Sequence, residues 1–403
     1  MNDNSQQKAK SDVVRIVSQH GGEYLLTCLT CGNCISRCFL VDGYPELNPR
    51  KLIWKVLSGK SQEMVDSEFL WACTLCGRCT TDCPKGIQMD VIIRELRGIA
   101  QEQGKAPKRI VEGVQSALEF GNNVRLPSDE FVETVEWLAE EVEEEADGFS
   151  EGTLEVPFDR EGAEILYMPN PREYTSNPSM FQTYLKFFAY TETDWTLSSK
   201  YYDITNWAYY LGDHDAAVQL VRNLVEETRR LGVKTLLSTE CGHGFKILRN
   251  DAERWLGEPL GFQVLGAVEL AAQYLKEGRI KVNRSCGRVT YHDPCNVGRK
   301  MGIYEEPREI LRAVSEDFVE LWPNRKYSIC CGGGGSVGQN TDMGQKRLVH
   351  AQAKRDQILR ADAQILATCC QNCLSQLTDL RDRYDMPIEV KSVIELLVDA
   401  MEA

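Results

Sequence analysis

Thirteen of the sixteen cysteines in this 403-residue sequence fall into two patterns that bind metal. The first pattern is a pair of runs, each with the spacing C-x2-C-x2-C-x3-C. Three thiolates at this spacing can surround one iron–sulfur cubane, and the fourth cysteine usually ligates the cubane of the other run. The runs therefore indicate two [4Fe–4S] clusters. The predicted ligands are Cys28, Cys31, Cys34 and Cys83 for one cluster, and Cys73, Cys76, Cys79 and Cys38 for the other.

The residues around the two runs favour clusters over zinc. Gly32 and Gly77 allow the backbone to approach a cubane closely. Pro84 follows the last cysteine of the second run, as in bacterial ferredoxins, whereas Phe39 takes that place in the first run. Two zinc sites are the alternative, and the doubled run of four cysteines makes them the weaker one.

The second pattern is sparser, and each of its cysteine groups follows a segment expected to be a strand. The five cysteines are Cys295, Cys330, Cys331, Cys370 and Cys373, and the strands are 288–292, 326–329 and 363–367. Ligands of open α/β sheets bind at the carboxyl ends of strands, and helix N-termini beyond them stabilise negative charge. Adjacent Cys330 and Cys331 cannot readily chelate one iron. Five thiolates also exceed the four of a cubane, which indicates a cluster of another shape.

Several residues beside these cysteines are candidates for supporting roles. Gly332 and Gly333 leave backbone room beside a bulky cluster. His292 and Asp293 are expected to orient Cys295 by hydrogen bonds, and a strand-end turn stabilised by Asp293-Pro294 is the alternative. Cys241 is a candidate ligand or substrate partner, although a buried structural thiol is the commoner fate of a lone cysteine.

The elements that must position these residues change along the chain. Helices are expected at 13–26, 48–58 and 89–104, so the paired runs lie at turns between helices. An acidic segment at 129–147 has apolar residues at helical spacing, which predicts an amphipathic helix. From 162 onward strands alternate with helices, and this alternation indicates parallel sheets.

The second half of the chain contains a diverged repeat. Residues 164–171 align with 288–295, and 236–244 align with 365–373. The first copy retains only Cys241 of the five cysteines. Its other cysteine positions are occupied by Pro171, Ser198, Ser199 and Gly244. Only one cluster of the unusual shape, the special cluster, is therefore expected, on the five cysteines of the sparse pattern.

These motifs resemble those of the heterodisulfide reductase catalytic subunits, with their cysteine-rich CCG domains. The matching segments are YHDPCNVGRKMGIYEEPREIL at 291–311, CCGGGG at 330–335 and CCQNC at 369–373. The N-terminal runs resemble the helical ferredoxin domain that is fused to CCG domains in the single-chain, D-type subunits. The resemblance covers nearly the whole chain.

The resemblance implies an α+β multidomain fold, in which a helical two-cluster ferredoxin domain precedes two α/β CCG-type subdomains with parallel sheets. The expected units are 1–110, the ferredoxin domain; 111–161, an acidic helix and linker; 162–285, a degenerate CCG subdomain; and 286–403, the CCG subdomain with a non-cubane cluster.

The resemblance also implies a function. Single electrons from a flavin-, haem- or quinol-linked redox subunit pass through two cubane [4Fe–4S] clusters to one non-cubane [4Fe–4S] cluster, which reduces a small-molecule or protein disulfide or runs in reverse. The implied catalytic residues are Cys295, Cys330, Cys331, Cys370, Cys373 and Cys241. The alternative is a non-catalytic relay within a large anaerobic assembly, such as a membrane sulfite-reductase-linked or benzoyl-CoA reductase complex.

Composition limits the partners and the cellular location that are expected for the chain. The net charge of −14 argues against nucleic acid as a partner. Residues 1–12 are polar, and apolar runs stay below membrane-spanning length, so no signal segment and no direct membrane span are expected. Iron–sulfur clusters imply a reducing compartment. The expected location is cytoplasmic, with any membrane attachment made through a partner subunit.

Overall fold

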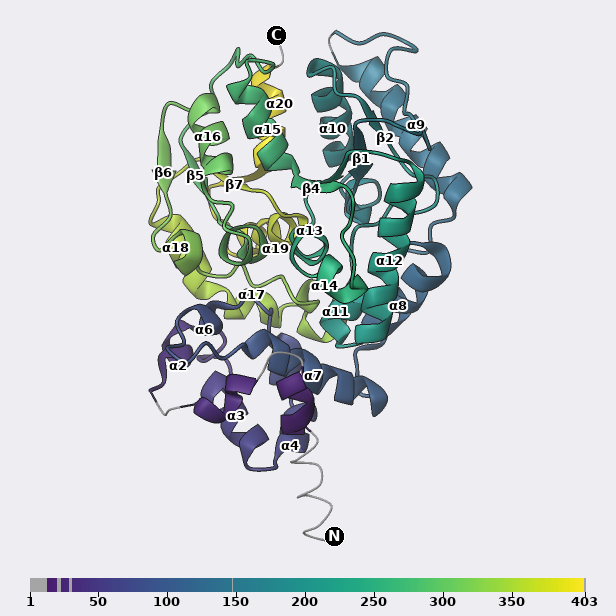
Figure 1. The fold of residues 1–403 in the computed structure, drawn as a ribbon. Coiled ribbons are helices and arrows are strands. Elements are labelled where there is room, and N and C mark those ends of the chain that lie inside the picture. The colour runs from purple at the N-terminus through teal and green to yellow at the C-terminus, as the bar shows by residue number, and fades with distance from the viewer. Residues whose placement is uncertain (1–12, 20–22, 29–30, 147, 402–403) are drawn as a thin grey trace.

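The computed structural model describes residues 13–19, 23–28, 31–146 and 148–401, and it begins with a helical head at the bottom of Figure 1. Short helices in the head bracket the cysteine runs, and a longer helix closes it. These elements are η2 (Glu23–Thr27), α2 (Asn33–Arg37), α3 (Pro49–Leu57), α4 (Ser61–Val65), α5 (Glu68–Ala72), α6 (Arg78–Thr81) and α7 (Met89–Glu102). Residues 13–19 are also helical, while 20–22 of the helix expected at 13–26 lie outside the described residues.

Local sequence explains the two clearest helices of the head. The side chain of Asn48 accepts a hydrogen bond from the Lys51 N–H at 3.0 Å, and Pro49 occupies the first helical position of α3. Helix α7 ends shortly before Gly104, whose φ of 68° continues the chain in the left-handed region. The sequence predicts both helices, and both predictions are confirmed.

Two further helices connect the head to the sheets. They are α8 (Lys108–Phe120) and α9 (Ser128–Glu145), and α9 packs against α10 (Ser179–Tyr190) of the first sheet region. Phe131 of α9 is fully buried and stacks on Tyr202 with ring centroids 3.8 Å apart. Val135 and Leu138 are buried on the same face, while the acidic residues face solvent. The predicted amphipathic helix is therefore confirmed.

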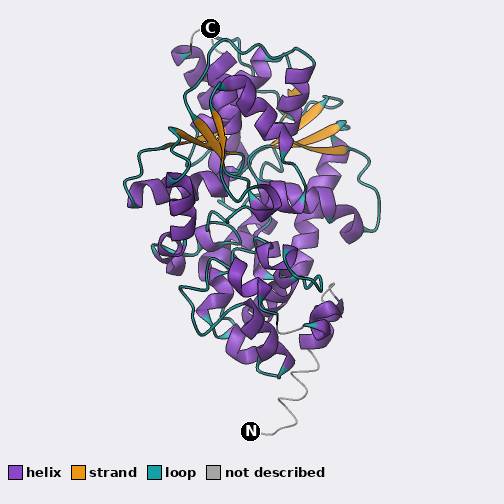
Figure 2. Cartoon of the chain, turned by 90° about the vertical axis from the view of Figure 1, so that its left-hand side faces the viewer, coloured by secondary structure: helices purple, strands orange, loops and turns teal. Residues whose placement is uncertain are grey.

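Beyond the linker, the described residues form two four-stranded sheets with the same topology. The strand orders are β2-β1-β3-β4 and β6-β5-β7-β8, and all pairings are parallel. Figure 2 shows the two groups of strands with helices between them. The strands are β1 (Ile165–Met168), β2 (Trp195–Thr196), β3 (Thr235–Ser238), β4 (Gln263–Gly266), β5 (Val289–Tyr291), β6 (Phe318–Glu320), β7 (Ile365–Thr368) and β8 (Glu389–Ser392). The repeat expected from the sequence is thus a repeat of fold, and the expected fold class is confirmed.

Helices cover both sheets and join them. In the first half these elements are η3 (Pro171–Glu173), α10, α11 (Trp207–Leu211), α12 (His214–Arg230), α13 (Gly242–Asn250), α14 (Ala252–Leu256) and α15 (Ala267–Lys276). In the second half they are η4 (Cys295–Lys300), α16 (Glu305–Val314), η5 (Arg325–Tyr327), η6 (Val337–Gln339), η7 (Thr341–Met343), α17 (Lys346–His350), α18 (Gln352–Leu359), α19 (Gln371–Arg383) and α20 (Val393–Met401). The C-terminal α20 packs against α10, α15 and α16, so it binds the two halves together. Within the described residues, every helix is too short or too polar to span a membrane.

One predicted strand is wrong. Residues 326–329 overlap the 3-10 helix η5, and the strand that precedes the cysteine pair is β6, at Phe318–Glu320. Arg325 has a φ of 51°, and Tyr327 is 42% exposed, so this segment is a surface turn. A loop of nine residues therefore carries the chain from β6 to Cys330.

Candidate iron–sulfur sites

The two cysteine runs surround neighbouring cavities in the head. The first cavity is lined by Cys28, Cys31, Cys34 and Cys83, and Cys79 also reaches it. The second cavity is lined by Cys38, Cys73, Cys76 and Cys79. Each fourth cysteine thus lies at the cavity of the other run. Gly32 and Gly77, at the starts of α2 and α6, have φ values of 78° and 72°, a backbone conformation that suits glycine.

The thiols of these cavities are poorly suited to remain as free thiolates. Burial raises the pKa of Cys34 to about 11, and the thiol of Cys28 adds to this rise. Burial likewise raises the pKa of Cys73 to about 11, although Arg97 opposes that rise. Crowded buried sulfurs need a cation to compensate their charge. A donor set of eight thiols in two fours fits two iron–sulfur clusters.

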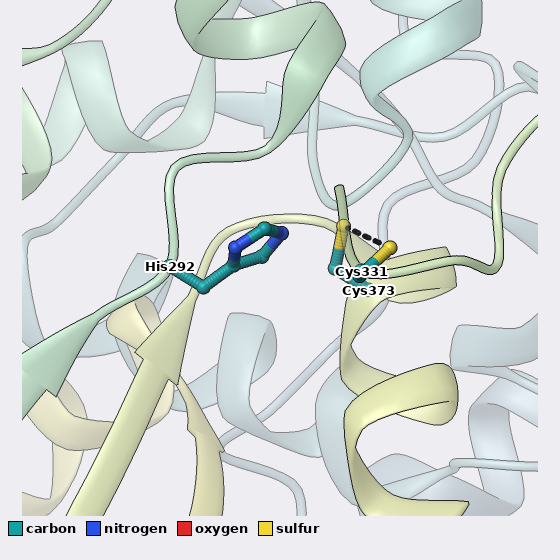
Figure 3. A group of neighbouring side chains, drawn as sticks. All are labelled: His292, Cys331 and Cys373. Carbon is teal, nitrogen blue, oxygen red and sulfur yellow. Dashed lines mark hydrogen bonds between the residues drawn. The ribbon is translucent and has the colours of Figure 1, made fainter. Parts of the chain in front are cut away.

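The five cysteines of the sparse pattern come together beside the carboxyl ends of β5 and β7. Cys295 begins η4, Cys370 precedes α19, and Cys373 lies in the first turn of α19. Cys330 and Cys331 come from the loop that leads into the four glycines at 332–335, the glycine segment. The Sγ atoms of Cys331 and Cys373 are 3.3 Å apart, as the dashed line in Figure 3 marks. Four of the five side chains are buried, and that of Cys295 is partly buried.

Two of these cysteines lie in surroundings that favour the thiolate. The Cys373 thiol and the backbone N–H groups of Cys373, Gly242 and Asn372 lower the pKa of Cys370 to about 6. The thiols of Cys330 and Cys373 lower the pKa of Cys331, toward which the Gly333 N–H also points at 3.5 Å. Thiolates are the form of cysteine that binds metal. This donor set fits a cluster that takes more than four thiolates.

The second ferredoxin cavity and the sparse site are in direct contact. Cys76 packs against the buried cluster that contains Cys330, and Thr74 Oγ1 lies 3.3 Å from Cys330 Sγ. A Cβ added at Gly335 would lie 2.6 Å from the carbonyl carbon of Thr74 and 2.8 Å from the Cys73 oxygen. The glycine segment therefore packs against the second cysteine run as closely as two backbones can.

A buried arginine secures this junction. Arg97 of α7 is fully buried and donates hydrogen bonds to four carbonyl oxygens. Its acceptors are Leu70 at 3.0 and 2.9 Å, Cys73 at 2.7 Å, Tyr210 at 3.0 Å and Gly335 at 2.9 Å. These acceptors belong to the head, the first sheet region and the second sheet region, so one side chain joins all three.

The supporting residues expected from the sequence lie around the sparse site. A ring nitrogen of His292 and the sulfurs of Cys331 and Cys373 lie within 4.8 Å of one another. In Figure 3 the imidazole points toward both sulfurs. The Gly332 N–H points at Cys330 Sγ from 3.4 Å. Asp293 instead forms two ion-pair contacts with Arg308, at 2.7 and 2.9 Å, which stabilise the turn.

Cys241 lies opposite the cluster cysteines, at the start of α13. Its sulfur is 3.3 Å from His243 Nδ1, and His243 Nε2 accepts a hydrogen bond from the Asn206 N–H at 3.1 Å. The Nδ1 nitrogen of neutral His243 therefore carries the proton and donates it toward Cys241. Burial raises the pKa of Cys241, and the charge of Cys370 raises it further. Burial thus keeps the Cys241 thiol neutral in the neighbourhood of Cys370.

The residues that stand at the lost cysteine positions of the first repeat have other structural roles. Ser198 Oγ donates to buried Glu227 at 2.7 Å, and Ser199 Oγ donates to Asp159 at 2.5 Å. Pro171 begins η3 behind the side-chain cap of Asn170. A Cβ at Gly244 would lie 2.1 Å from the Ile204 oxygen, so the position has no room for a cysteine.

Several residues at these sites were missed by sequence reasoning. They are Thr74, Arg97, Arg172, Tyr210 and Lys354; Thr74 lies inside the second cysteine run, and the other four lie outside the cysteine motifs. Arg172 lies near the sulfurs of Cys370 and Cys241, and Tyr210 stacks near His243 with ring centroids 4.6 Å apart. Two of them had a positional signal: Thr74 directly follows Cys73, and Arg172 follows the aligned Pro171.

Two families of known domains match the chain at these sites. The 4Fe-4S dicluster domain family matches residues 23–87, and the cysteine-rich domain family called CCG matches residues 289–378. Fold and sites thus define an iron–sulfur protein with a dicluster head and a CCG cysteine-rich domain.

Individual relatives extend this similarity over most of the chain. The chain is 27% identical to the dihydromethanophenazine:CoB–CoM heterodisulfide reductase D subunit of Methanosarcina mazei, over 93% of each protein. It is 24% identical to the Hdr-like menaquinol oxidoreductase iron-sulfur subunit of Archaeoglobus profundus, over 93% of this chain and 79% of that one. It is 26% identical to the EtfAB:quinone oxidoreductase of Syntrophomonas wolfei, over 84% of this chain and 48% of that one. The resemblance inferred from the sequence is confirmed.

Proposed function

We propose that this chain is the iron–sulfur electron-transfer subunit of a heterodisulfide-reductase-like complex and that it reduces a disulfide. The head, within 1–110, would hold two cubanes on the cysteine sets that line its two cavities. The region 286–403 would hold one non-cubane cluster on five thiolates. Region 162–285 would complete the fold without a cluster of its own, and 111–161 would connect it to the head. The homologous heterodisulfide reductase D subunits support this assignment.

The contact between Cys76 and Cys330 is the observation that carries the proposal. One cysteine belongs to the ferredoxin run and the other to the CCG site, so the two sites are neighbours and an electron would have a short path between them. Thr74 and Gly335 lie beside these two cysteines, and because Gly335 has no side chain, the two backbones can approach each other there. The bound clusters supply single-electron storage and, at the sparse site, iron that can bind a thiolate.

The chemistry requires two electrons and two protons for each disulfide: RSSR′ + 2e⁻ + 2H⁺ gives RSH and R′SH. The chain supplies thiolate-favouring surroundings at Cys370 and Cys331, and these two residues would hold iron. We assign Cys241, a neutral thiol near Cys370, to the substrate side of the site. The donor would be a flavin-, haem- or quinol-linked subunit. The names of the menaquinol and EtfAB:quinone relatives favour a quinone-linked one.

Anaerobic metal analysis and a disulfide assay test the proposal with a matched pair of variants. The wild type should contain about twelve iron and twelve sulfide per chain, as three four-iron clusters require. Cys370→Ser should lose the special cluster, leaving about eight iron, and should lose viologen-driven disulfide reduction. Cys369→Ser should keep both. Cys369 is one residue away, equally buried, and hydrogen-bonded at 3.1 Å to the Tyr291 hydroxyl. About eight iron in the wild type would refute the three-cluster assignment.

A non-catalytic relay is the second candidate, because the first motif has lost four of its five cysteines. In that case the special cluster would accept electrons from reduced viologen, yet no disulfide would be reduced. A full complement of iron, together with zero turnover and no new EPR signal on adding thiol, would favour the relay over the reductase.

A further inference from the structure

A lysine is buried beside the sparse cysteine site without a carboxylate as its direct partner. Lys354 of α18 is 1% exposed. Its Nζ lies 3.0 Å from His292 Nδ1 and 2.5 Å from Gln357 Oε1, and both partners are neutral groups. The titratable groups nearest to it are the thiols of Cys331, Cys330 and Cys373, followed by the carboxylate of Asp293. Burial lowers its pKa to about 8, so the ammonium form still prevails at neutral pH.

This ammonium fixes the tautomer of His292. An ammonium group has only donors, so Lys354 must donate to His292 Nδ1. Burial, and then the charge of Lys354, lower the pKa of His292, so the imidazole is neutral. A neutral imidazole whose Nδ1 accepts carries its proton on Nε2.

The Nε2–H group of His292 is a buried donor without a partner among the described residues. The ring is 1% exposed and points toward the sulfurs of Cys331 and Cys373 (Figure 3). Leaving such a donor unsatisfied costs about 1–3 kcal/mol. Sulfur atoms at the five-cysteine site would satisfy it. A protonated Nε2, in turn, cannot bind iron.

The other side of the lysine is fixed as well. Gln357 donates its Nε2–H to the Pro323 carbonyl at 2.8 Å, which turns Oε1 toward Lys354. A series of hydrogen bonds through Pro323, Gln357, Lys354 and His292 therefore leads from a surface loop to the cysteines. At its inner end, the ring of His292 is oriented toward the sulfurs.

We propose that Lys354 and His292 act together as a positioning pair that donates the His292 Nε2–H to sulfur at the Cys331–Cys373 face of the special cluster and holds a positive charge behind it. The pair raises the reduction potential of that cluster, because a hydrogen bond and a cation both stabilise the more negative reduced state. The proposal about this pair rests on the proposed function in one respect, since it requires a cluster on the five cysteines.

Redox titration followed by EPR tests the pair, with iron and sulfide measured for every sample. Lys354→Met and His292→Leu should each shift the midpoint potential of the special cluster to lower values. His292→Gln places an amide N–H near the position of Nε2, so it should restore most of the potential. Lys276→Met is the control, because that lysine is 64% exposed and paired with Glu309. It should leave the potential unchanged.

Pulsed ENDOR of the reduced wild-type protein supplies a second readout. An exchangeable proton and a weak histidine nitrogen coupling should be present, and both should be absent from His292→Leu. Strong nitrogen coupling would mean that His292 binds iron directly, which would overturn the proposal. Unchanged potentials in Lys354→Met and His292→Leu at full iron would overturn the pair alone. About eight iron in the wild type would instead overturn the cluster assignment itself.

Discussion

Cys241 and Cys370 occupy equivalent positions in the two halves of the α/β region and lie near each other. Each directly precedes the helix that follows the third strand of its own sheet, α13 in one case and α19 in the other. A Cβ added at Gly242 of the first half would lie 3.6 Å from the Cys370 sulfur, and the Gln371 N–H of the second half donates to the Glu240 carbonyl at 2.7 Å. The repeat thus brings two helix N-termini, each with its cysteine, to one point.

We predict that Cys241→Ala lowers disulfide turnover without loss of iron. The thiol lies near Cys370 but has no place among the five clustered cysteines, so its loss should cost activity by about 10- to 100-fold. Steady-state disulfide reduction with viologen, alongside metal analysis, measures both quantities. Cys286→Ala, which changes a partly buried thiol beside Ser315, should leave both unchanged. A fall in iron with Cys241→Ala would make Cys241 a ligand instead.

We predict that cysteine cannot be restored at the first motif. Gly244→Cys would place its Cβ 2.1 Å from the Ile204 oxygen, and overpacking of this kind costs about 1–3 kcal/mol or more. Thermal unfolding under anaerobic conditions should show a lower Tm, and the iron content should not rise. Ser199→Cys is the control at a partly buried position and should shift the Tm less. A second special EPR signal in Gly244→Cys would contradict the prediction.

The parts of this fold that were predictable depend on short-range patterns. Cysteine spacing indicated the paired runs, because ligands of one cluster often lie within a few residues of one another, and the carboxyl ends of expected strands indicated the sparse site. The amphipathic helix α9, on which Phe131 and Val135 are buried, could be predicted because its apolar residues recur at every helix turn. Alternating strands and helices likewise indicated parallel sheets, and the two four-stranded sheets follow that rule.

The unpredictable parts depend on distant partners. Arg97 and Gly335 meet across 238 positions, and no local pattern marks either as a contact. Lys354 lies in a polar helical segment that is typical of a surface, yet it is buried because His292, 62 positions away, accepts its hydrogen bond. The segment at 326–329 has strand-like residues, but it turns because Arg325 takes a positive φ. Tertiary contacts decide each of these cases.

We predict that Arg97→Met destabilises the junction between head and sheets. Four carbonyl groups would lose a charged donor while still buried, which costs about 3–5 kcal/mol by analogy with broken buried pairs. Arg97→Lys should rescue little, since an ammonium cannot replace the planar fork. Anaerobic thermal unfolding of the holoprotein measures the loss. Arg360→Met, at an exposed position, should leave the Tm near that of the wild type. An unchanged Tm in Arg97→Met would show that these hydrogen bonds contribute nothing net.

We predict that Gly335→Ala slows electron transfer into the special cluster. Its Cβ would lie 2.6 Å from the Thr74 carbonyl carbon, so the glycine segment must move away from the second cysteine run and widen the gap between Cys76 and Cys330. Gly302→Ala is a matched control. It has a similar positive φ, 79° against 61°, but an added Cβ there meets no atom within 4 Å. Both variants should lose about 1–2 kcal/mol from backbone strain. Only Gly335→Ala should slow the reduction of the special cluster by dithionite in stopped-flow measurements, while the cubanes reduce at the wild-type rate. Equal slowing in the two variants would assign the effect to strain and remove the junction from the electron path.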